Sequence, residues 1–273
     1  EGVADILDKR LLFGNQVELC VDVAVDTLTS LPTDGDNSGI SHLHLVVDAD
    51  GVDADFGIFL LSEVLVLVPL GRMTLSLELN LGKLDVLAID FGASGGRAIV
   101  GTWENGEIRA TEIHRFTNDP VRIGGTLYWD VLRLLHEIKQ SLLKAKPYGI
   151  AGIGIDTWGV DFGLIDAQGR LLANPVHYRD ARAHGTVQKA LGQISAEELY
   201  AVTGNQIMEI NTLFQLIALR EQDPELLARA DKLLLMPDLF AYFLTGEIGA
   251  ERSIASTTQL YDQKTGDWAY ERS

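Results

Sequence analysis

The stretch DVLAIDFGASGGRAIVGTW, residues 85–103, decides the fold of this chain. An apolar run brings an acid, Asp90, to a turn of small residues at 91–96, and a second apolar run leaves that turn. Residues 98–103 are rich in β-branched and aromatic side chains, so they predict a strand and not a helix. A Walker P-loop and a Rossmann fingerprint both lead into a helix and are therefore excluded. The stretch predicts a β-hairpin whose tip offers a carboxylate and backbone N–H groups, which suits an anion and its cation.

The composition of the chain is that of an ordinary globular protein, with 273 residues, 47% hydrophobic and 22% charged. A net charge of −17 argues against a nucleic-acid partner, which needs clustered Lys and Arg. The single cysteine, Cys20, excludes an intramolecular disulfide and favours a reducing compartment. The longest apolar stretch, 56–70, contains Glu63 and Pro69 and is shorter than the roughly 20 residues of a membrane span. We therefore expect a cytoplasmic protein with no nucleic-acid or membrane partner, and the sequence indicates no oligomeric state.

The N-terminal part of the chain, residues 1–84, differs from the rest. It carries 4 Lys and Arg against 14 Asp and Glu, and it contains no Trp or Tyr. Because the chain begins with Glu1 and its first methionine is Met73, residues 1–72 are either a small acidic β-rich domain or a non-native extension. A run of aspartates resembles a calcium loop but fails the EF-hand spacing, and we interpret it as solvated surface (Asp48, Asp50, Asp53 and Asp55).

From residue 85 onward the pattern predicts an α/β domain with a mixed sheet. Asn105-Gly106 is a strong hairpin signal, and Asp130 is a candidate N-cap for a helix that ends near Ala145. Further strands are predicted at 108–116, at 149–155 (buried) and at 160–165. Three more helix starts are predicted from capping patterns (Ser195 with Glu198, Thr212 with Gln215, and Asp223 with Pro224).

A second group of chemistry-bearing residues lies in GIDTWGVDF, residues 154–162. A strand again delivers an acid, Asp156, followed by Trp158, a glycine and a second acid, Asp161. Carboxylates beside an aromatic ring suit a polyol, because the acids accept hydroxyl hydrogen bonds and the ring covers an apolar sugar face. The alternative, a core tryptophan with two acids that cap turns, is left open by the pattern.

A third charged group lies in HYRDAR, residues 177–182. We interpret Arg179, Asp180 and Arg182 as a surface ion-pair network. The histidines at 114, 136 and 184 lack metal-ligand spacing and are interpreted as structural.

Taken together and in order, seven motifs resemble the N-terminal domain of the FGGY family of carbohydrate kinases, in its rhamnulokinase branch. The resemblance covers residue 85 to the end of the chain and leaves out residues 1–72. It is carried by AIDFGASGGR (88–97), EIHRF (112–116), GIDTWGVDF (154–162), PVHYRD (175–180), NTLFQL (211–216), LMPDLF (235–240) and TTQL (257–260).

The resemblance implies a ribonuclease-H-like (actin/hexokinase-type) domain over residues 85–273, preceded by an acidic extension, residues 1–84, of uncertain fold. It implies transfer of the γ-phosphoryl group of ATP to the 1-hydroxyl of L-rhamnulose in rhamnose breakdown. Asp90 would lie near Mg²⁺, and the ketose would meet Gly159, Val160 and Asp161. The ATP phosphates would be cradled by the turn (Ala93, Ser94, Gly95, Gly96 and Arg97).

Two features depart from the family pattern. Gly95 stands where the family more often has Ser, which removes a hydroxyl donor. The general base of the family, an Asp, is expected beyond the position of Ser273, so we assign no catalytic base within this chain and predict no turnover by the chain alone. A kinase for another sugar, such as L-fuculose or xylulose, and a non-catalytic sugar- or nucleotide-binding module remain alternatives.

Overall fold

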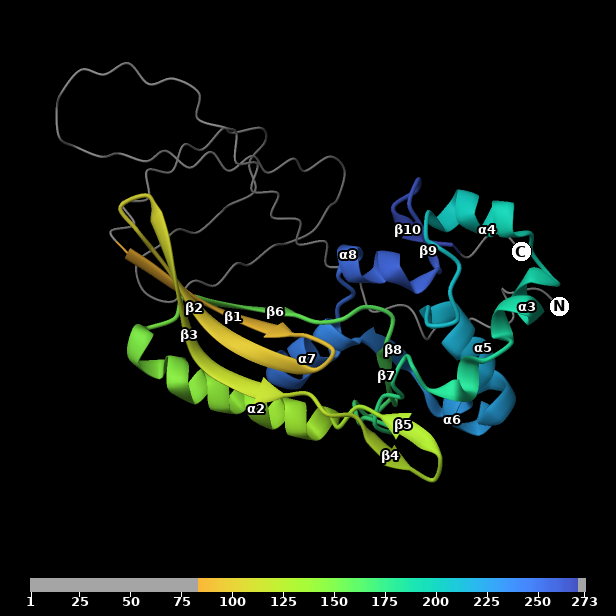
Figure 1. Ribbon diagram of the computed structural model, residues 1–273, viewed down its shortest axis with the longest axis horizontal. Helices are drawn as coiled ribbons and strands as arrows, with labels where there is room; N and C mark the ends of the chain where they lie inside the picture. The colour runs from red at the N-terminus through yellow and green to blue at the C-terminus, as the bar shows by residue number, and fades with distance from the viewer. Residues whose placement is uncertain (1–82, 270–273) are drawn as a thin grey trace, which may run out of the picture. The chain divides into compact units, whose positions relative to one another are not determined.

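The computed structural model describes residues 83–269 (Figure 1). The predictions for residues 1–82, including the acidic extension and its aspartates, lie outside the described residues. The described chain falls into two compact units. The larger holds Leu84–Thr102 and residues 108–269, whereas Lys83 and the hairpin tip Trp103–Glu107 belong to the other unit. The account that follows concerns the larger unit and, for the tip, only its local turn.

A four-stranded mixed sheet, with strand order β3-β2-β1-β6, forms the base of the larger unit. Two hairpins connect its first three strands, and the second turns at Asn105 (φ 53°) and Gly106 (φ 80°), as the Asn-Gly signal predicts. Strand β6 is parallel to β1, in a register that runs from Val86↔Gly152 to Asp90↔Asp156. The strands span Lys83–Phe91 (β1), Gly95–Glu104 (β2), Glu107–Thr117 (β3) and Gly152–Asp156 (β6).

Helix α2, Val131–Ala145, covers one face of this sheet (Figure 1). The Asp130 side chain accepts a hydrogen bond from the N–H of Arg133 at 3.2 Å, which confirms the predicted N-cap. Alternate residues of β1 and β2 point into the same core as the apolar face of the helix, because side chains of a strand alternate between its faces. The core includes Leu87, Ile89, Ala98, Val100, Val131, Leu134 and Ile138, all nearly inaccessible to solvent.

Strand β6 differs from its prediction, which made residues 149–155 a buried strand. Gly152, Ile153 and Gly154 are exposed, and Ile153 retains 49% of its accessible surface. The strand is at the edge of the four-stranded sheet, with one neighbour, β1, in the described part of the chain. The apolar run suggested cover on both faces, but three of its seven residues are glycines with no side chain to bury.

Most of the remaining elements surround a second core formed largely by α5 and a two-stranded sheet, whereas Met236, Leu239 and Phe240 belong to the first core. In that sheet β7, Phe162–Ile165, is antiparallel to β8, Lys232–Leu235. The helices are α3 (Thr186–Leu191), α4 (Ala196–Thr203), α5 (Thr212–Gln222), α6 (Pro224–Arg229), α7 (Met236–Thr245) and α8 (Arg252–Ala255). Short strand pairs are β4 (Val121–Ile123) with β5 (Thr126–Tyr128) and β9 (Tyr261–Asp262) with β10 (Asp267–Trp268).

Two of the three later capping predictions are confirmed. Ser195 accepts from the N–H of Glu198 at 3.1 Å, and Asp223 accepts from the N–H of Leu226 at 3.0 Å. The third is wrong, because α5 has Asn211 at its N-cap and the Thr212 hydroxyl bonds a distant loop instead. None of the helices within residues 83–269 is long and apolar enough to cross a membrane.

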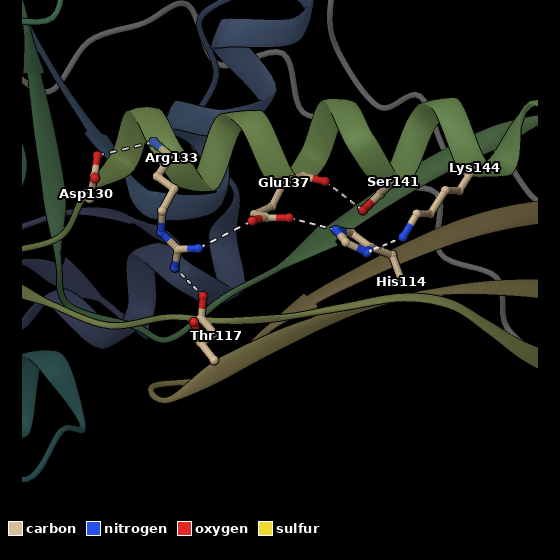
Figure 2. Close-up of polar contacts among 7 residues, drawn as sticks. All are labelled: His114, Thr117, Asp130, Arg133, Glu137, Ser141 and Lys144. Carbon is tan, nitrogen blue, oxygen red and sulfur yellow. Dashed lines mark hydrogen bonds and ion pairs between the residues drawn. The ribbon is translucent and has the colours of Figure 1, made fainter.

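A polar network joins β3 to α2 (Figure 2). His114 Nε2 lies 2.7 Å from Glu137 Oε2, and Lys144 Nζ donates to His114 Nδ1 at 2.7 Å. Because Nδ1 accepts, the imidazole proton is on Nε2 and points to Glu137. Arg133 extends the network, donating to Glu137 Oε1 at 3.3 Å and to the carbonyl of Thr117. His114 therefore has a structural contact, and the described residues contain no cluster of three His, Cys, Asp or Glu placed to hold a metal.

Replacing Glu137 with alanine is expected to lower the free energy of unfolding by about 1–2 kcal/mol, because the half-buried His114 and Arg133 lose their shared acceptor. Glu221→Ala is the matched control, since Glu221 pairs with Lys189 where both side chains are about half exposed. That pair is expected to contribute about 0.2–1 kcal/mol. Urea denaturation measures both, and equal losses would contradict a stabilising role for the network.

Candidate functional site

The turn between β1 and β2 is an exposed loop of small residues. Gly92 N–H donates to the carbonyl of Gly95 at 2.8 Å, which closes the turn. The N–H groups of Ala93 and Ser94 donate to no acceptor within residues 83–269, and both residues are exposed. The turn therefore presents two free backbone donors, as an anion cradle requires.

Asn118, just after β3, anchors this turn. Its side chain is buried and donates from Nδ2 to the carbonyl of Gly92 at 2.9 Å, while its N–H donates to the carbonyl of Ser94 at 3.2 Å. Sequence reasoning missed Asn118, because no motif surrounds it and two strands separate it from the turn along the chain. Its two bonds hold the carbonyls of the turn away from its outer surface, which leaves the N–H groups for a ligand.

The glycines of the turn serve close packing. A Cβ on Gly96 would lie 2.3 Å from Cζ of Phe116, and a Cβ on Gly95 would lie 3.0 Å from the carbonyl oxygen of Phe116. Neither glycine has a positive φ. Space for the Phe116 ring and backbone is therefore the constraint at these two positions.

Carboxylates gather at the edge of the sheet next to the turn. Asp90 and Asp156 end the parallel strands β1 and β6 and are register partners. Parallel strands place their carboxyl ends at one edge, where ligands of open α/β sheets bind. Asp90 Oδ2 pairs with Arg97 Nε at 3.0 Å, and both side chains are nearly half exposed. The structure thus brings together the predicted Asp90 and Arg97 and adds Asp156.

The second predicted site has a buried carboxylate, Asp161, at its base. Burial raises the pKa of Asp161 to about 6, against hydrogen bonds that lower it. Four donors reach its two oxygens: Trp129 Nε1 at 2.6 Å, Trp158 Nε1 at 3.0 Å, Gln215 Nε2 at 2.8 Å and the N–H of Tyr178 at 3.1 Å. Three of these donors reach Oδ2 and one reaches Oδ1, so the carboxylate fixes the two indoles in place.

Aromatic rings stack next to Asp161. The Trp129 ring centroid lies 4.0 Å from those of Trp158 and His177. Burial, with help from the charge of Arg179, lowers the pKa of His177 to about 4, so this imidazole is neutral at physiological pH. Sequence reasoning missed Trp129 and placed His177 in a separate charged stretch, because both are distant from Asp161 along the chain and come close to it only through the fold.

The backbone at Gly159–Asp161 forms a tight γ-turn. Asp161 N–H donates to the carbonyl of Gly159 at 2.9 Å, and Val160 has a φ of 68°. Thr212 Oγ1 donates to the carbonyl of Val160 at 2.7 Å, and Thr257 Oγ1 accepts from the N–H of Val160 at 3.2 Å. A Cβ on Gly159 would lie 3.0 Å from Thr257 Oγ1, so the turn and Thr257 are in close contact.

A pocket of about 480 Å³ lies above this turn. Gly159 and Val160 line it, whereas Asp161 is fully buried and does not. Aromatic faces and polar side chains share the remaining lining, a combination that suits a polyol (Trp158, Tyr178, Arg179, Asn205, Gln206, Met208, Ile210, Asn211 and Thr257).

The prediction of a surface ion-pair network at 177–182 is wrong. Asp180 is buried and accepts from the N–H groups of Leu127 at 2.7 Å and Arg182 at 3.0 Å, so it caps a local turn. The Arg182 guanidinium donates to Gln215 Oε1 at 3.0 Å, and Arg179 lies 5.3 Å above the ring of Tyr178. Alternating charges suggested ion pairs, but the backbone donors of the turn are nearer to Asp180.

A larger hollow, of about 750 Å³, lies between the end of α2 and the start of β6. Its lining is aliphatic apart from Lys139 and Lys146, and it contains no carboxylate. It lacks the convergent polar groups of a small-molecule site, so the smaller pocket above the γ-turn is the better candidate.

The fold agrees with comparisons to known proteins. The model of the FGGY family of carbohydrate kinases, N-terminal domain, matches residues 86–272. A rhamnulokinase of Yersinia pestis bv. Antiqua (strain Angola) is 44% identical over 187 residues, which cover 67% of this chain and 39% of that protein. A rhamnulokinase of Bacteroides thetaiotaomicron is 43% identical over 185 residues, covering 67% and 38%.

The crystal structure of gluconate kinase from Lactobacillus acidophilus superimposes with a TM-score of 0.62 at 18% identity, covering 69% of this chain and 39% of that one. The likeness in fold confirms the predicted actin/hexokinase-type α/β class. The chain spans less than two fifths of the length of the rhamnulokinases named above. On the family match and these identities, the chain belongs to the FGGY family of carbohydrate kinases, with residues 86–272 as its N-terminal domain.

Proposed function

We propose that this chain supplies the sugar- and phosphate-binding part of a kinase that transfers the γ-phosphoryl group of ATP to the 1-hydroxyl of L-rhamnulose. The observation that carries the proposal is the turn at 92–95, where two free N–H donors lie beside the carboxylate of Asp90 at the end of a parallel strand. Similarity to rhamnulokinases supports the choice of sugar. Phosphoryl transfer is mostly positioning and charge stabilisation, which such donors supply.

In this proposal the turn binds the phosphates of ATP. Backbone N–H groups donate to phosphate oxygens and the Arg97 guanidinium adds a positive charge. Gly95 and Gly96 let the turn pack against Phe116 and so fix its outline. The residues assigned to ATP are Ala93, Ser94, Gly95, Gly96 and Arg97.

The carboxylates beside the turn fit a magnesium ion. Mg²⁺ is bound through one or two carboxylates together with waters and substrate phosphates. Asp90 is partly exposed at the strand end, and Asp156 is its register partner, so the donor set matches that chemistry. We assign the ion to Asp90, with Asp156 next to it. When bound, the ion would neutralise phosphate charge.

The sugar is assigned to the pocket above the γ-turn. The backbone of Gly159 and Val160 would contact the ketose, and the Trp158 ring would cover its apolar face, including the methyl group of a 6-deoxy sugar. Asp161 enters this site through Trp158, because its carboxylate holds the indole N–H at 3.0 Å. The reaction would take place in the cytoplasm, where ATP is available.

No carboxylate of the described residues is assigned as general base. Asp161 and Asp180 are buried and already accept several hydrogen bonds, so neither can receive a proton from a sugar hydroxyl in the pocket. We therefore expect this chain alone to bind its ligands without measurable ATP consumption. Appreciable turnover with L-rhamnulose would contradict this expectation.

Isothermal titration of the full chain with L-rhamnulose, L-fuculose and D-xylulose tests the assignment. L-rhamnulose is expected to bind most tightly, and Gly159→Ala is expected to weaken it about tenfold or more, since the new Cβ pushes Thr257 toward the pocket. Gly249→Ala is the control, because no heavy atom lies within 4 Å of its added Cβ. Tighter binding of another ketose would replace L-rhamnulose as the assigned substrate. Binding of ATP without binding of any sugar would favour a nucleotide-binding module.

A further inference from the structure

Val160 adopts a backbone conformation that its side chain disfavours. Its φ of 68° is in the left-handed region, where a β-branched residue is strained. Such strain persists only when surrounding contacts hold the backbone in place. The contacts on the two polar backbone groups of Val160 come from side chains 52 to 97 residues away.

Two of these side chains are on α5, and both are buried away from the pocket. Thr212 is inaccessible to solvent and donates to the carbonyl of Val160 at 2.7 Å. Gln215, 1% exposed, lies one helical turn later and reaches the same carbonyl at 3.3 Å. Its amide also donates to Asp161 Oδ1 at 2.8 Å and to the carbonyl of Ile210 at 2.9 Å. Neither Thr212 nor Gln215 lines the pocket.

These bonds explain the sequence pattern that local reasoning misassigned. Thr212 and Gln215 have the spacing of a capping box, but their side chains donate to the carbonyl of Val160 in the γ-turn and do not cap the helix. The turn, in contrast, contributes Gly159 and Val160 to the wall of the pocket. The direct contact between the Thr212 hydroxyl and the wall of the pocket is therefore the backbone at 159–161.

We propose that Thr212 and Gln215 are positioning residues of the sugar pocket, which act by clamping the carbonyl of Val160 and so hold a strained backbone wall in its binding geometry. This rests on the proposed function, which places the sugar in that pocket. Without the clamp, the turn relaxes toward a negative φ at Val160 and the wall moves. A bound sugar then loses contacts that the folded chain had arranged beforehand.

Thr212→Val tests the clamp, because it removes the hydroxyl and keeps the shape of the side chain. Binding of L-rhamnulose to the full chain is expected to weaken about tenfold, the equivalent of one lost hydrogen bond. Thr212→Ser keeps the donor and is expected to restore the affinity. Thr186→Val is the matched control, since Thr186 is 1% exposed and its hydroxyl donates to the carbonyl of Ala183 at 2.6 Å, away from the pocket.

The melting temperature separates positioning from stability. Thr212→Val and Thr186→Val each remove one buried hydrogen bond, so both are expected to lower it by similar amounts. Only Thr212→Val is expected to change the affinity for the sugar. Equal affinities for these two variants would overturn the proposal.

The strain itself is tested by comparing Val160→Ala with Val160→Gly. Glycine normally destabilises a folded position relative to alanine, but at a positive φ it is favoured. We therefore expect Val160→Gly to melt above Val160→Ala, and Leu164→Gly to melt below Leu164→Ala in the neighbouring strand β7. If Val160→Gly melts below Val160→Ala, the turn is not strained and the proposal fails. If the unsubstituted chain binds none of the ketoses, the proposed function fails instead, and the positioning role falls with it.

Discussion

Gly96→Ala is expected to disrupt the turn at 92–95 and to abolish measurable binding of ATP. The added Cβ would lie 2.3 Å and 2.5 Å from two ring carbons of Phe116, closer than any real contact. The ring cannot simply move aside, because it packs edge-on against Phe91 at a centroid distance of 5.2 Å. We expect a loss of about 1–3 kcal/mol in the free energy of unfolding, as for other overpacked sites.

Gly101→Ala is the control for this prediction, on the same strand β2. Its added Cβ would meet Val86 Cγ2 at 3.4 Å, an ordinary contact. Stability is expected to stay unchanged or to rise slightly, since alanine loses less backbone entropy on folding than glycine. Chemical denaturation and calorimetry with Mg·ATP measure both variants. Normal ATP binding by a folded Gly96→Ala protein would refute the assignment of this turn to the phosphates.

Removal of the carboxylate in Asp161→Ala is expected to cost about 3–5 kcal/mol of unfolding free energy. The substitution leaves two indole N–H groups and the N–H of Tyr178 without the acceptor that the buried carboxylate gives them. Tryptophan fluorescence is expected to shift to the red as water reaches the indoles. Asp130→Ala, which removes only a helix cap, is expected to cost about 1 kcal/mol. Similar losses in the two variants would contradict a central role for Asp161.

The pH dependence of Asp161→Asn carries a definite sign. Burial holds the pKa of Asp161 at about 6 in the folded protein, above its ordinary value of 3.8. Between these values the folded state binds more protons than the unfolded state, so this group adds stability as the pH falls. Asparagine does not titrate, and we therefore expect the stability of the parent chain relative to Asp161→Asn to grow from pH 7 to pH 4. Urea denaturation of both proteins at several pH values measures this difference in stability. A flat or opposite trend would contradict the expectation.

Features set by neighbouring residues could be predicted from the sequence. The Asn105-Gly106 turn, the Asp130 cap and the strand at 85–91 each depend on side chains within a few positions of one another. The turn between β1 and β2 could be predicted for the same reason, since Asp90 and Gly96 lie in one short stretch.

Features set by distant residues could not be predicted. Asp161 accepts hydrogen bonds from Trp129 and Gln215, which are 32 and 54 residues away along the chain, and no spacing in the sequence predicts such contacts. Thr212 fits a local capping pattern, yet its hydroxyl donates to the carbonyl of Val160, because a buried carbonyl without a hydrogen-bond donor is costly. Asp180 likewise accepts from a distant backbone N–H, that of Leu127, whereas its charged neighbours in the sequence had suggested ion pairs.

The parallel pairing of β1 with β6 has a consequence for synthesis on the ribosome. Val86 pairs with Gly152, which is made only after β2, β3 and α2, so within residues 83–269 one edge of β1 has no partner strand until β6 emerges. At roughly 5–20 residues per second this interval lasts on the order of 10 s. An unpaired strand edge is a template for pairing with another nascent chain. We therefore expect the yield of native protein to depend on the pace of translation through residues 118–151 as well as on the stability of the finished fold.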